Sequence, residues 1–355
     1  MSNATTGGRM RSARGRTFDL GILALIGVLL FGALAAGTAA LYREFYSPSA
    51  FVLRYLSMLE SGRAADALAM PGVTLDGRQL TNARLPQSAS DALLRSAALG
   101  DLDDAEITGE VQDGDTTIVS ARYEAGGHRA TTSFRIARNG TIGLAPSWRF
   151  AQSPLAVMKV SVAGSMTFEV NSFSLDKRQV SPEGADADPL APVSMLVFSP
   201  GLYSISVDTP IAKTPGMAVL ADAPMVNVPV TLQAEPTQKF IDVVQQRVEE
   251  FLTNCTSQQV LQPTGCPFGF VVRNRVEQLP KWTITEQPEI SVVADGAGWR
   301  IPDTAATAHI DLTVRSLFDG ALYPVAEDVP FVVNGTISVL PDGTASIRLG
   351  GSDLD

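Results

Sequence analysis

Histidine and cysteine are almost absent from the chain, which holds two of each in 355 residues. Catalysis by a serine or cysteine nucleophile normally needs a histidine as its base. His128 and His309 lie far apart in the sequence, and neither has the spacing of a metal ligand. The chain also lacks the GxSxG and HExxH motifs and a glycine-rich phosphate loop. We therefore predict a protein that is not an enzyme, with no catalytic residue, no cofactor and no metal site.

The two cysteines, Cys255 and Cys266, are close enough in sequence to form one disulfide. Such bonds persist in oxidising compartments. Closing so short a loop stabilises a fold by about 3 kcal/mol in the chain-entropy model. A metal site would need more ligands, and the two histidines are distant in sequence. We therefore predict a Cys255–Cys266 disulfide in a body that lies outside the cytoplasm.

Basic residues are outnumbered, with 27 Lys and Arg against 37 Asp and Glu and a pI of about 4.8. Nucleic-acid binding needs clustered positive charge, so we expect no nucleic-acid partner. Acidic residues gather at Asp101, Asp103 and Asp104, but without the spacing of a calcium loop. We interpret them as solvated turn residues. Hydrophobic residues make up 45% of the chain, which is enough to build packed cores.

Charge is entirely absent from one stretch, Leu20–Tyr42. At about 1.5 Å per residue this run makes a helix of roughly 34 Å, which exceeds the ~30 Å hydrocarbon core of a bilayer. Four arginines precede it: Arg9, Arg11, Arg14 and Arg16. Positive residues in a short flank stay in the cytoplasm. The sequence thus predicts a disordered cytoplasmic tail at 1–19, a transmembrane helix at 20–42 in contact with the lipid bilayer, and an outer body (type II, single pass). Small residues near the end of the run leave a cleaved signal peptide as the alternative.

The pattern of apolar residues divides the outer body into three units, 47–150, 154–235 and 236–350. In the first unit, Ser47-Pro48 predicts the start of a helix, and apolar residues then recur at helical spacing. Alternating residues further on predict four strands: 105–111, 116–125, 129–137 and 142–150. The turns between them are predicted at Asp113-Gly114, Gly126-Gly127 and Asn139-Gly140.

The second unit alternates as short strands around a loop at Ser181–Pro192, which is rich in proline, alanine and acidic residues. The third unit opens with an amphipathic helix predicted at Thr237–Asn254, and Cys255 follows on its apolar face. A series of strands completes the third unit, with hairpin turns predicted at Asn334-Gly335 and Asp342-Gly343.

The first unit, from FVLRYLSMLESGRAADALAM to PSWRF, resembles the cone-shaped NTF2-like fold. In the second unit, VSVAG and FSPGLYSISV resemble the small β-module called PEGA. The third unit again places a helix before a meander, and its GWR is similar to the SWR of the first. These resemblances imply an α+β fold: one N-terminal transmembrane helix, then two NTF2-like domains flanking a small all-β module. They also make Tyr55 and Trp148 candidates for lining a pocket in the cone.

Taken together, the anchor and these modules resemble the outer part of the teicoplanin-resistance-associated membrane protein family. The resemblance implies a non-enzymatic binding or structural protein of the cell envelope, anchored in the membrane and exposed outside. Its partner would be an envelope protein or a cell-wall component. The family's cytoplasmic zinc ribbon is absent, because residues 1–19 hold no cysteine. Two alternatives stay open: an enzyme with a pocket in the cone, and an accessory subunit of a transport or secretion complex.

Overall fold

The computed structural model describes residues 23, 25–33, 45–143, 145–340 and 343–351. Among these residues, no helix is long and apolar enough to cross a membrane. The predicted transmembrane helix at Leu20–Tyr42 is therefore wrong, and so is the predicted location in a cell membrane with the N-terminus inside and the body outside. The tail 1–19, with Arg9, Arg11, Arg14 and Arg16, lies outside the described residues.

The described residues are mostly β, with 46% in strands and 21% in helices. From residue 45 onward, only α2 and α6 are longer than six residues. The predicted α+β class with a transmembrane helix and two NTF2-like domains is therefore wrong. The physical reason is the amount of strand: most of the buried apolar surface belongs to residues that alternate along strands, and two helices cover only part of it.

The first part of the chain packs α2 and α3 against an antiparallel sheet in the order β1-β2-β3-β4, whereas Leu80 of α4 belongs to a separate small cluster with Val157. Its elements are α2 (Pro48–Glu60), α3 (Ala64–Leu68), α4 (Gly77–Asn82), the 3-10 turn Ser96–Ala98, β1 (Asp103–Asp113), β2 (Thr116–Ala125), β3 (His128–Ile142) and β4 (Ala145–Phe150). Helix α2 begins as predicted, because the Ser47 side chain accepts a hydrogen bond from the Ala50 amide and Pro48 occupies the first turn. Its apolar face packs on the sheet through Phe51 and Tyr55.

The middle part holds two small sheets, ordered β11-β9-β6-β7 and β12-β5-β8, and a two-stranded pair β10-β13. Its elements are β5 (Leu155–Ala163), β6 (Thr167–Val170), β7 (Phe173–Asp176), α5 (Lys177–Val180), the 3-10 turn Gly184–Asp186, β8 (Val193–Phe198), β9 (Gly201–Ser206), β10 (Ala212–Lys213), β11 (Met217–Ala221), β12 (Asn227–Gln233) and β13 (Glu235–Pro236). β12 runs parallel to β5, whereas the other pairs in these sheets are antiparallel. The two sheets pack face to face around residues such as Val160, Phe168 and Tyr203.

The last part is a long twisted sheet, ordered β14-β16-β17-β18, with one helix packed on it. Its elements are α6 (Gln238–Thr256), β14 (Arg275–Glu286), β15 (Val293–Asp295), β16 (Gly298–Arg315), β17 (Leu322–Val339) and β18 (Ala345–Gly351). The predicted helix Thr237–Asn254 is confirmed within two residues, with Thr237 as its cap. The predicted disulfide is also present: Cys255 at the end of α6 is bonded to Cys266, and the S–S distance is 2.05 Å.

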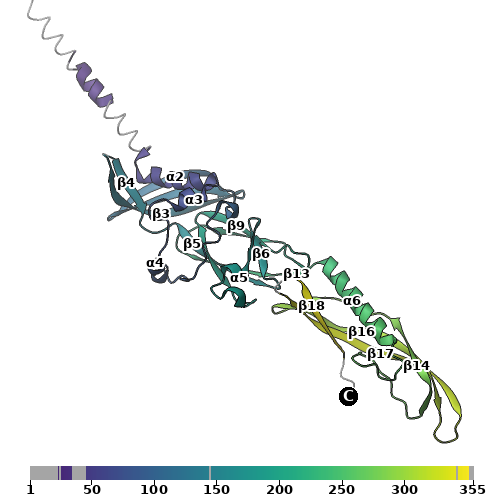
Figure 1. The fold of residues 1–355 in the computed structure, drawn as a ribbon. Coiled ribbons are helices and arrows are strands. Elements are labelled where there is room, and N and C mark those ends of the chain that lie inside the picture. The colour runs from purple at the N-terminus through teal and green to yellow at the C-terminus, as the bar shows by residue number, and fades with distance from the viewer. Residues whose placement is uncertain (1–22, 24, 34–44, 144, 341–342, 352–355) are drawn as a thin grey trace, which may run out of the picture.

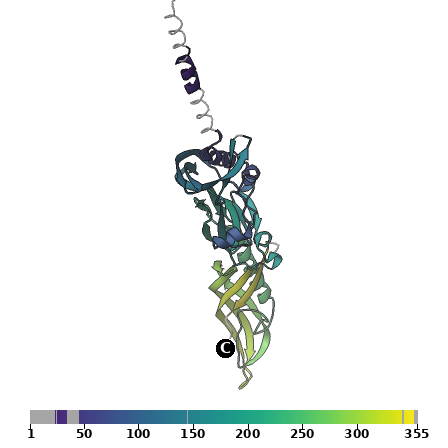
Figure 2. The same ribbon diagram turned by 90° about the vertical axis from the view of Figure 1, so that its left-hand side faces the viewer.

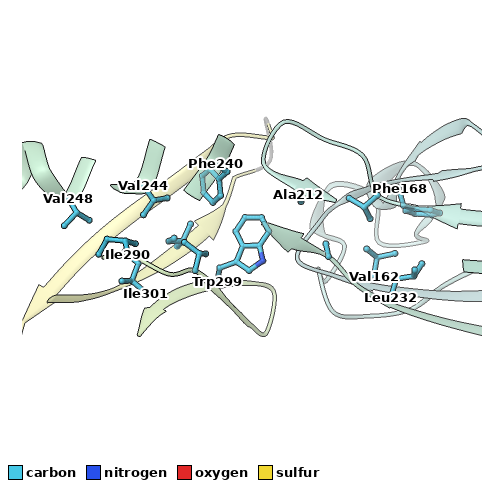
Figure 3. Packing of buried hydrophobic residues seen from close by; sticks show 14 of the residues in the cluster. Val162, Phe168, Ala212, Leu232, Phe240, Val244, Val248, Ile290, Trp299 and Ile301 are labelled. Carbon is cyan, nitrogen blue, oxygen red and sulfur yellow. The ribbon is translucent and has the colours of Figure 1, made fainter. Parts of the chain in front are cut away.

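The molecule is elongated, with α2 and β4 near one end and the β16–β17 hairpin at the other (Figures 1 and 2). One buried cluster extends through both the middle and the last parts. It includes Val162, Phe168 and Leu232 on one side and Phe240 and Trp299 on the other (Figure 3). The predicted boundary at residue 236 therefore falls inside a continuous core, and the predicted domain division itself stays a prediction.

Candidate functional site

A cleft of about 530 Å³ opens between the helices of the first part and the edge strand β4. Trp148, one of the two residues predicted to line a pocket, lies in its wall. The other lining residues come from the segment before α2, from α2, from the α3 region and from the start of β4: Phe45, Tyr46, Ser47, Phe51, Arg54, Met58, Arg63, Asp66, Ala69, Met70, Pro71, Ala145, Pro146 and Ser147. Most of these side chains are apolar, which is typical of a site that binds another molecule.

Trp148 is held in place by its own hydrogen bond. The indole Nε1 donates to the carbonyl oxygen of Tyr46 at 2.8 Å, which ties β4 to the segment that leads into α2. The rest of the ring is only partly buried and faces the cleft. A tryptophan with a satisfied N–H and a solvent-accessible face is a rigid apolar surface, which costs little conformational entropy when a partner covers it.

Met70 and Pro71, which also line the cleft, are fixed by close backbone packing between the segment Met70–Gly72 and Phe150. The Phe150 amide donates to the Pro71 carbonyl at 2.9 Å. Gly72 has φ +82°, and a Cβ placed there would lie 2.3 Å from the Phe150 carbonyl oxygen. Only glycine fits this position, because the turn needs both a positive φ and the absence of a side chain. The cleft is therefore a preformed feature of the fold.

Two arginines give the cleft a positive edge. Arg63 is paired with Asp66 at 2.7 Å, and both side chains are about half exposed. The guanidinium of Arg54 makes one long hydrogen bond, 3.4 Å to the Phe45 carbonyl, in the described part of the chain. Since that bond uses one of its five donors, Arg54 can also bind a carboxylate. The site thus combines apolar and aromatic walls with a cation that has spare donors.

Tyr55, the second residue predicted to line a pocket, lies in the closed core instead. Its ring packs edge-on against Phe134 at 5.9 Å and Phe150 at 5.1 Å. Its hydroxyl donates to the Ser199 carbonyl at 3.1 Å. Burial, and secondarily the nearby Tyr203, raise the pKa of Tyr55 well above its usual value, so the phenol stays protonated. Tyr55 and Trp148 therefore do not line the same pocket: Trp148 lies in the cleft and Tyr55 in the core.

The sequence reading missed Arg54, Met58, Arg63 and Met70 as lining residues. A signal for part of this set was present. Phe51, Arg54 and Met58 recur at spacings of three and four, so they lie on one side of α2. Apolar periodicity alone does not mark this side of the helix, because Arg54 interrupts it.

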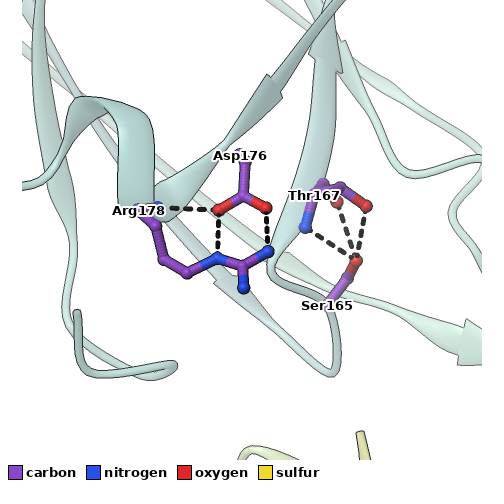
Figure 4. A network of polar contacts seen from close by, with 4 residues as sticks. All are labelled: Ser165, Thr167, Asp176 and Arg178. Atoms are coloured by element: carbon purple, nitrogen blue, oxygen red, sulfur yellow. Dashed lines mark hydrogen bonds and ion pairs between the residues drawn. The ribbon is translucent and has the colours of Figure 1, made fainter. Parts of the chain in front are cut away.

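Polar side chains outside the cleft have structural roles. Asp176 caps α5 and forms an ion pair with Arg178 (Figure 4). The hydrogen bond that the Asp176 carboxylate accepts from the Arg178 side chain lowers the pKa of Asp176. Beside it, the Ser165 hydroxyl donates to the Thr167 carbonyl at 2.7 Å. Lys177 is buried, and its ammonium donates to the Val162 and Pro189 carbonyls, which fastens the loop Ser181–Pro192 to the middle part. Burial lowers the pKa of Lys177.

His309 lies on the surface of β16, between Asp328 at 2.7 Å and Asp311 at 3.6 Å. The hydrogen bond to Asp328 is the main reason that the pKa of His309 is raised. The described residues contain no group of three or more His, Cys, Asp or Glu side chains arranged to hold a metal ion. His128, the other histidine, lies at the start of β3, at the turn that follows β2.

The cleft is thus the feature best suited to bind another molecule. No protein-family model matches the chain. No curated protein matches it either. The resemblance to the outer part of the teicoplanin-resistance-associated family therefore stays a prediction, and the function has to be argued from the cleft and the shape.

Proposed function

We propose that this protein is a non-enzymatic binding protein, which holds an apolar segment of a protein partner in the cleft beside Trp148. The observation that carries the proposal is the preformed pairing of an aromatic wall, centred on Trp148, with the Arg54 guanidinium at its edge. Tryptophan and arginine are the side chains most enriched among residues that dominate binding energy at protein interfaces. The segment that fits has large apolar side chains and an Asp, a Glu or a C-terminal carboxylate close to them.

A binding role is favoured over catalysis by the position of the shifted groups. The tyrosines with the largest rises in pKa, Tyr55 and Tyr203, owe them chiefly to burial among apolar side chains. The groups that line the cleft, Arg54, Arg63 and Asp66, are charged and solvent-exposed. A general acid or base has to reach the substrate, which the buried tyrosines cannot do, and the exposed charges of the cleft are suited to attracting a charged segment.

The experiment that tests the proposal is site-specific photocrosslinking in intact cells. A photoreactive amino acid replaces Ser147, which lines the cleft, and a second chain carries it at Val111, an exposed residue of β1. We expect a defined crosslinked band from position 147 only, which mass spectrometry then identifies. Trp148→Ala and Arg54→Glu should each remove this band from the position 147 chain.

Two outcomes of the crosslinking would contradict the proposal. Identical bands from positions 147 and 111 would mean that the cleft has no partner of its own. A band that survives Trp148→Ala and Arg54→Glu would mean that neither wall of the cleft contributes to binding. Circular dichroism of each variant shows that the fold is intact, since Arg54 is exposed and Trp148 is only partly buried.

A further inference from the structure

The hairpin between β16 and β17 lies at the end of the molecule opposite α2 (Figure 1). Large apolar side chains are exposed there. Phe318 is 100% exposed and Leu317 74% exposed, both in the turn. Leu322 and Tyr323, at the start of β17, are 53% and 48% exposed. We call these four residues the tip. Single exposed apolar residues are ordinary, but four within seven positions of one protruding turn mark an interaction site.

The turn that carries the tip is ordered by its own hydrogen bonds. The Ser316 amide donates to the Ala321 carbonyl at 2.9 Å, and the Gly320 amide to the Ser316 carbonyl at 3.1 Å. The Asp319 carboxylate accepts from the Ala321 amide at 3.1 Å. Arg315 adds a hydrogen bond to the Gly320 carbonyl at 3.2 Å. Because the backbone is fixed in advance, Phe318 is displayed at no further conformational cost when the tip is covered.

The shape of the tip decides which kind of surface can cover it. Phe318 projects from the apex with its whole side chain in solvent. A rigid protein partner would need a matching hollow, whereas the boundary between lipid headgroups and acyl chains closes around any convex apolar group. Aromatic and leucine side chains are the ones that enter that boundary most favourably.

The charge around the tip differs from the charge of the whole chain. Three arginines lie at this end, Arg273, Arg275 and Arg315, against two carboxylates, Glu277 and Asp319. Glu277 is bonded to Arg315 through both its oxygens, at 3.0 and 3.1 Å. The end of the molecule is thus slightly positive, while the chain as a whole has a net charge of −10.

The acidic remainder of the protein does not prevent an end-on contact. The nearest surface carboxylates beyond the turn on these strands are Asp311, which pairs with Ala326, and Glu327, which pairs with Ile310. At about 3.3 Å per residue, the four residues from Arg315 to Asp311 extend roughly 13 Å. That distance exceeds the Debye length of about 8 Å at physiological ionic strength. A flat anionic surface that touches the tip is therefore screened from the acidic body.

From these observations we infer that the tip is a peripheral docking site for an anionic lipid surface, into which Leu317 and Phe318 insert while the arginines contact the headgroup phosphates. This contact lies at the end of the molecule remote from α2. It does not depend on what the cleft beside Trp148 binds, so each proposal can fail without the other.

The test uses the full chain, with Ala321→Cys labelled by an environment-sensitive fluorophore. Both native cysteines are held in the disulfide, so the label attaches to the introduced thiol. The probes are vesicles of phosphatidylglycerol with phosphatidylcholine, and vesicles of phosphatidylcholine alone, each in excess. We expect a blue shift of the fluorophore, and quenching by spin-labelled lipid, with the anionic vesicles. Because the fluorophore is attached at the tip, its emission shifts only when the tip itself enters the lipid. Contact of another part of the chain with the vesicle does not produce the shift.

Substitutions on the labelled chain then assign the effect to the tip. The double variant Leu317→Ser, Phe318→Ser should weaken the vesicle-dependent shift by at least about tenfold, since each side chain loses most of its transfer free energy. Val111→Ser, an equally exposed apolar residue of β1, is the matched control and should leave the shift unchanged.

Two results would overturn the inference. A reporter that stays silent with both kinds of vesicle would exclude a lipid surface and leave a protein partner as the occupant of the tip. An equal response to neutral and anionic vesicles would exclude the role given to the arginines. Because Leu317 and Phe318 are exposed, the double variant should keep its fold, and circular dichroism checks this.

Discussion

Two buried tryptophans of the last part differ in a single hydrogen bond. Trp282 on β14 and Trp299 on β16 are 3% and 1% exposed. Each packs at an interplanar angle of 50° against a phenylalanine, Phe268 or Phe240. The Trp282 Nε1 donates to the Val260 carbonyl at 2.8 Å, whereas the Trp299 Nε1 has no partner among the described residues. A buried donor without an acceptor costs about 1–3 kcal/mol.

Phenylalanine at these two positions should therefore have unequal effects on stability. Trp282→Phe and Trp299→Phe remove the same ring volume, so their cavity costs are similar. Trp282→Phe also loses a hydrogen bond, while Trp299→Phe removes an unsatisfied N–H. We expect Trp282→Phe to lower the free energy of unfolding by about 1 kcal/mol more than Trp299→Phe, as measured by urea denaturation. Equal losses, or a larger loss for Trp299→Phe, would show that the Trp299 N–H is satisfied in solution.

At the scale of elements, the sequence predicted best where one periodicity extended over many residues. The apolar stripe of α6 located that helix within two residues and placed Cys255 beside Cys266. The long alternation of β1 to β3 was found for the same reason. Such patterns are readable because every second or every third to fourth side chain must face one core.

The hairpin turns predicted at two Asn-Gly dipeptides are wrong. Asn139-Gly140 and Asn334-Gly335 were predicted as hairpin turns, but both lie inside long strands, β3 and β17. Gly140 has φ +86° at a register shift between β3 and β4, so it forms a bulge. At Gly335 a Cβ would lie 2.8 Å from the Arg348 carbonyl oxygen, so glycine allows close strand packing there. The same dipeptide serves turns, bulges and close approaches, and only the neighbouring strands distinguish them.

Of the two residues predicted to line a pocket, only Trp148 lies in the cleft. Trp148 stands in a short edge strand beside Pro146, which is a pattern typical of a partly exposed residue. Tyr55 belongs to the apolar stripe of α2, and its burial depends on Phe134 and Phe150, which approach it only in the folded sheet. The Arg54 guanidinium reaches the same cleft because α3 and β4 fold against α2. Such contacts between distant segments leave no periodic trace in the sequence.

The disulfide after α6 should contribute to stability without being needed for folding. Cys255→Ser opens a loop of eleven residues, and the chain-entropy model gives a loss of about 3 kcal/mol in the free energy of unfolding. We expect the fold to persist, because Gln258 also holds this loop through a 2.8 Å hydrogen bond from the Thr264 amide. Urea denaturation with and without reductant measures the effect. Reductant should destabilise the wild-type chain and leave Cys255→Ser unchanged. Two free thiols in the unreduced wild type would contradict the bond.

The whole molecule is an elongated body with a different kind of apolar surface at each end. The cleft beside Trp148 is concave and preformed, and the tip at Phe318 is convex and preformed. Between them, β16 and β17 have 18 residues each and extend about 60 Å. With both surfaces binding as proposed above, the protein would connect a partner at each end, which requires the parts between the ends to be mechanically continuous.

That continuity leads to a prediction about the core shared by the middle and last parts. Phe240 of α6 is 5% exposed and belongs to the same buried cluster as Val160 of β5 and Val230 of β12. Phe240→Ala should cost about 3–5 kcal/mol. If the cluster unfolds as one cooperative unit, amides of β5 and β12 should lose as much hydrogen-exchange protection as amides of α6. Loss confined to α6 and its sheet would mean that the predicted boundary at residue 236 separates two independent units.

Phe134→Ala is the matched control for this experiment. Phe134 is also buried, at 1% exposure, but it belongs to the other buried cluster, with Tyr55 and Phe150. Its substitution should cost a similar free energy and reduce protection in α2 and β2, while α6 keeps its protection. A global loss of protection from both substitutions would instead mean that all three parts unfold together, since the two clusters also meet near Leu155 and Phe198. Native-state exchange at low denaturant resolves these outcomes, because it reports the opening free energy of each strand separately.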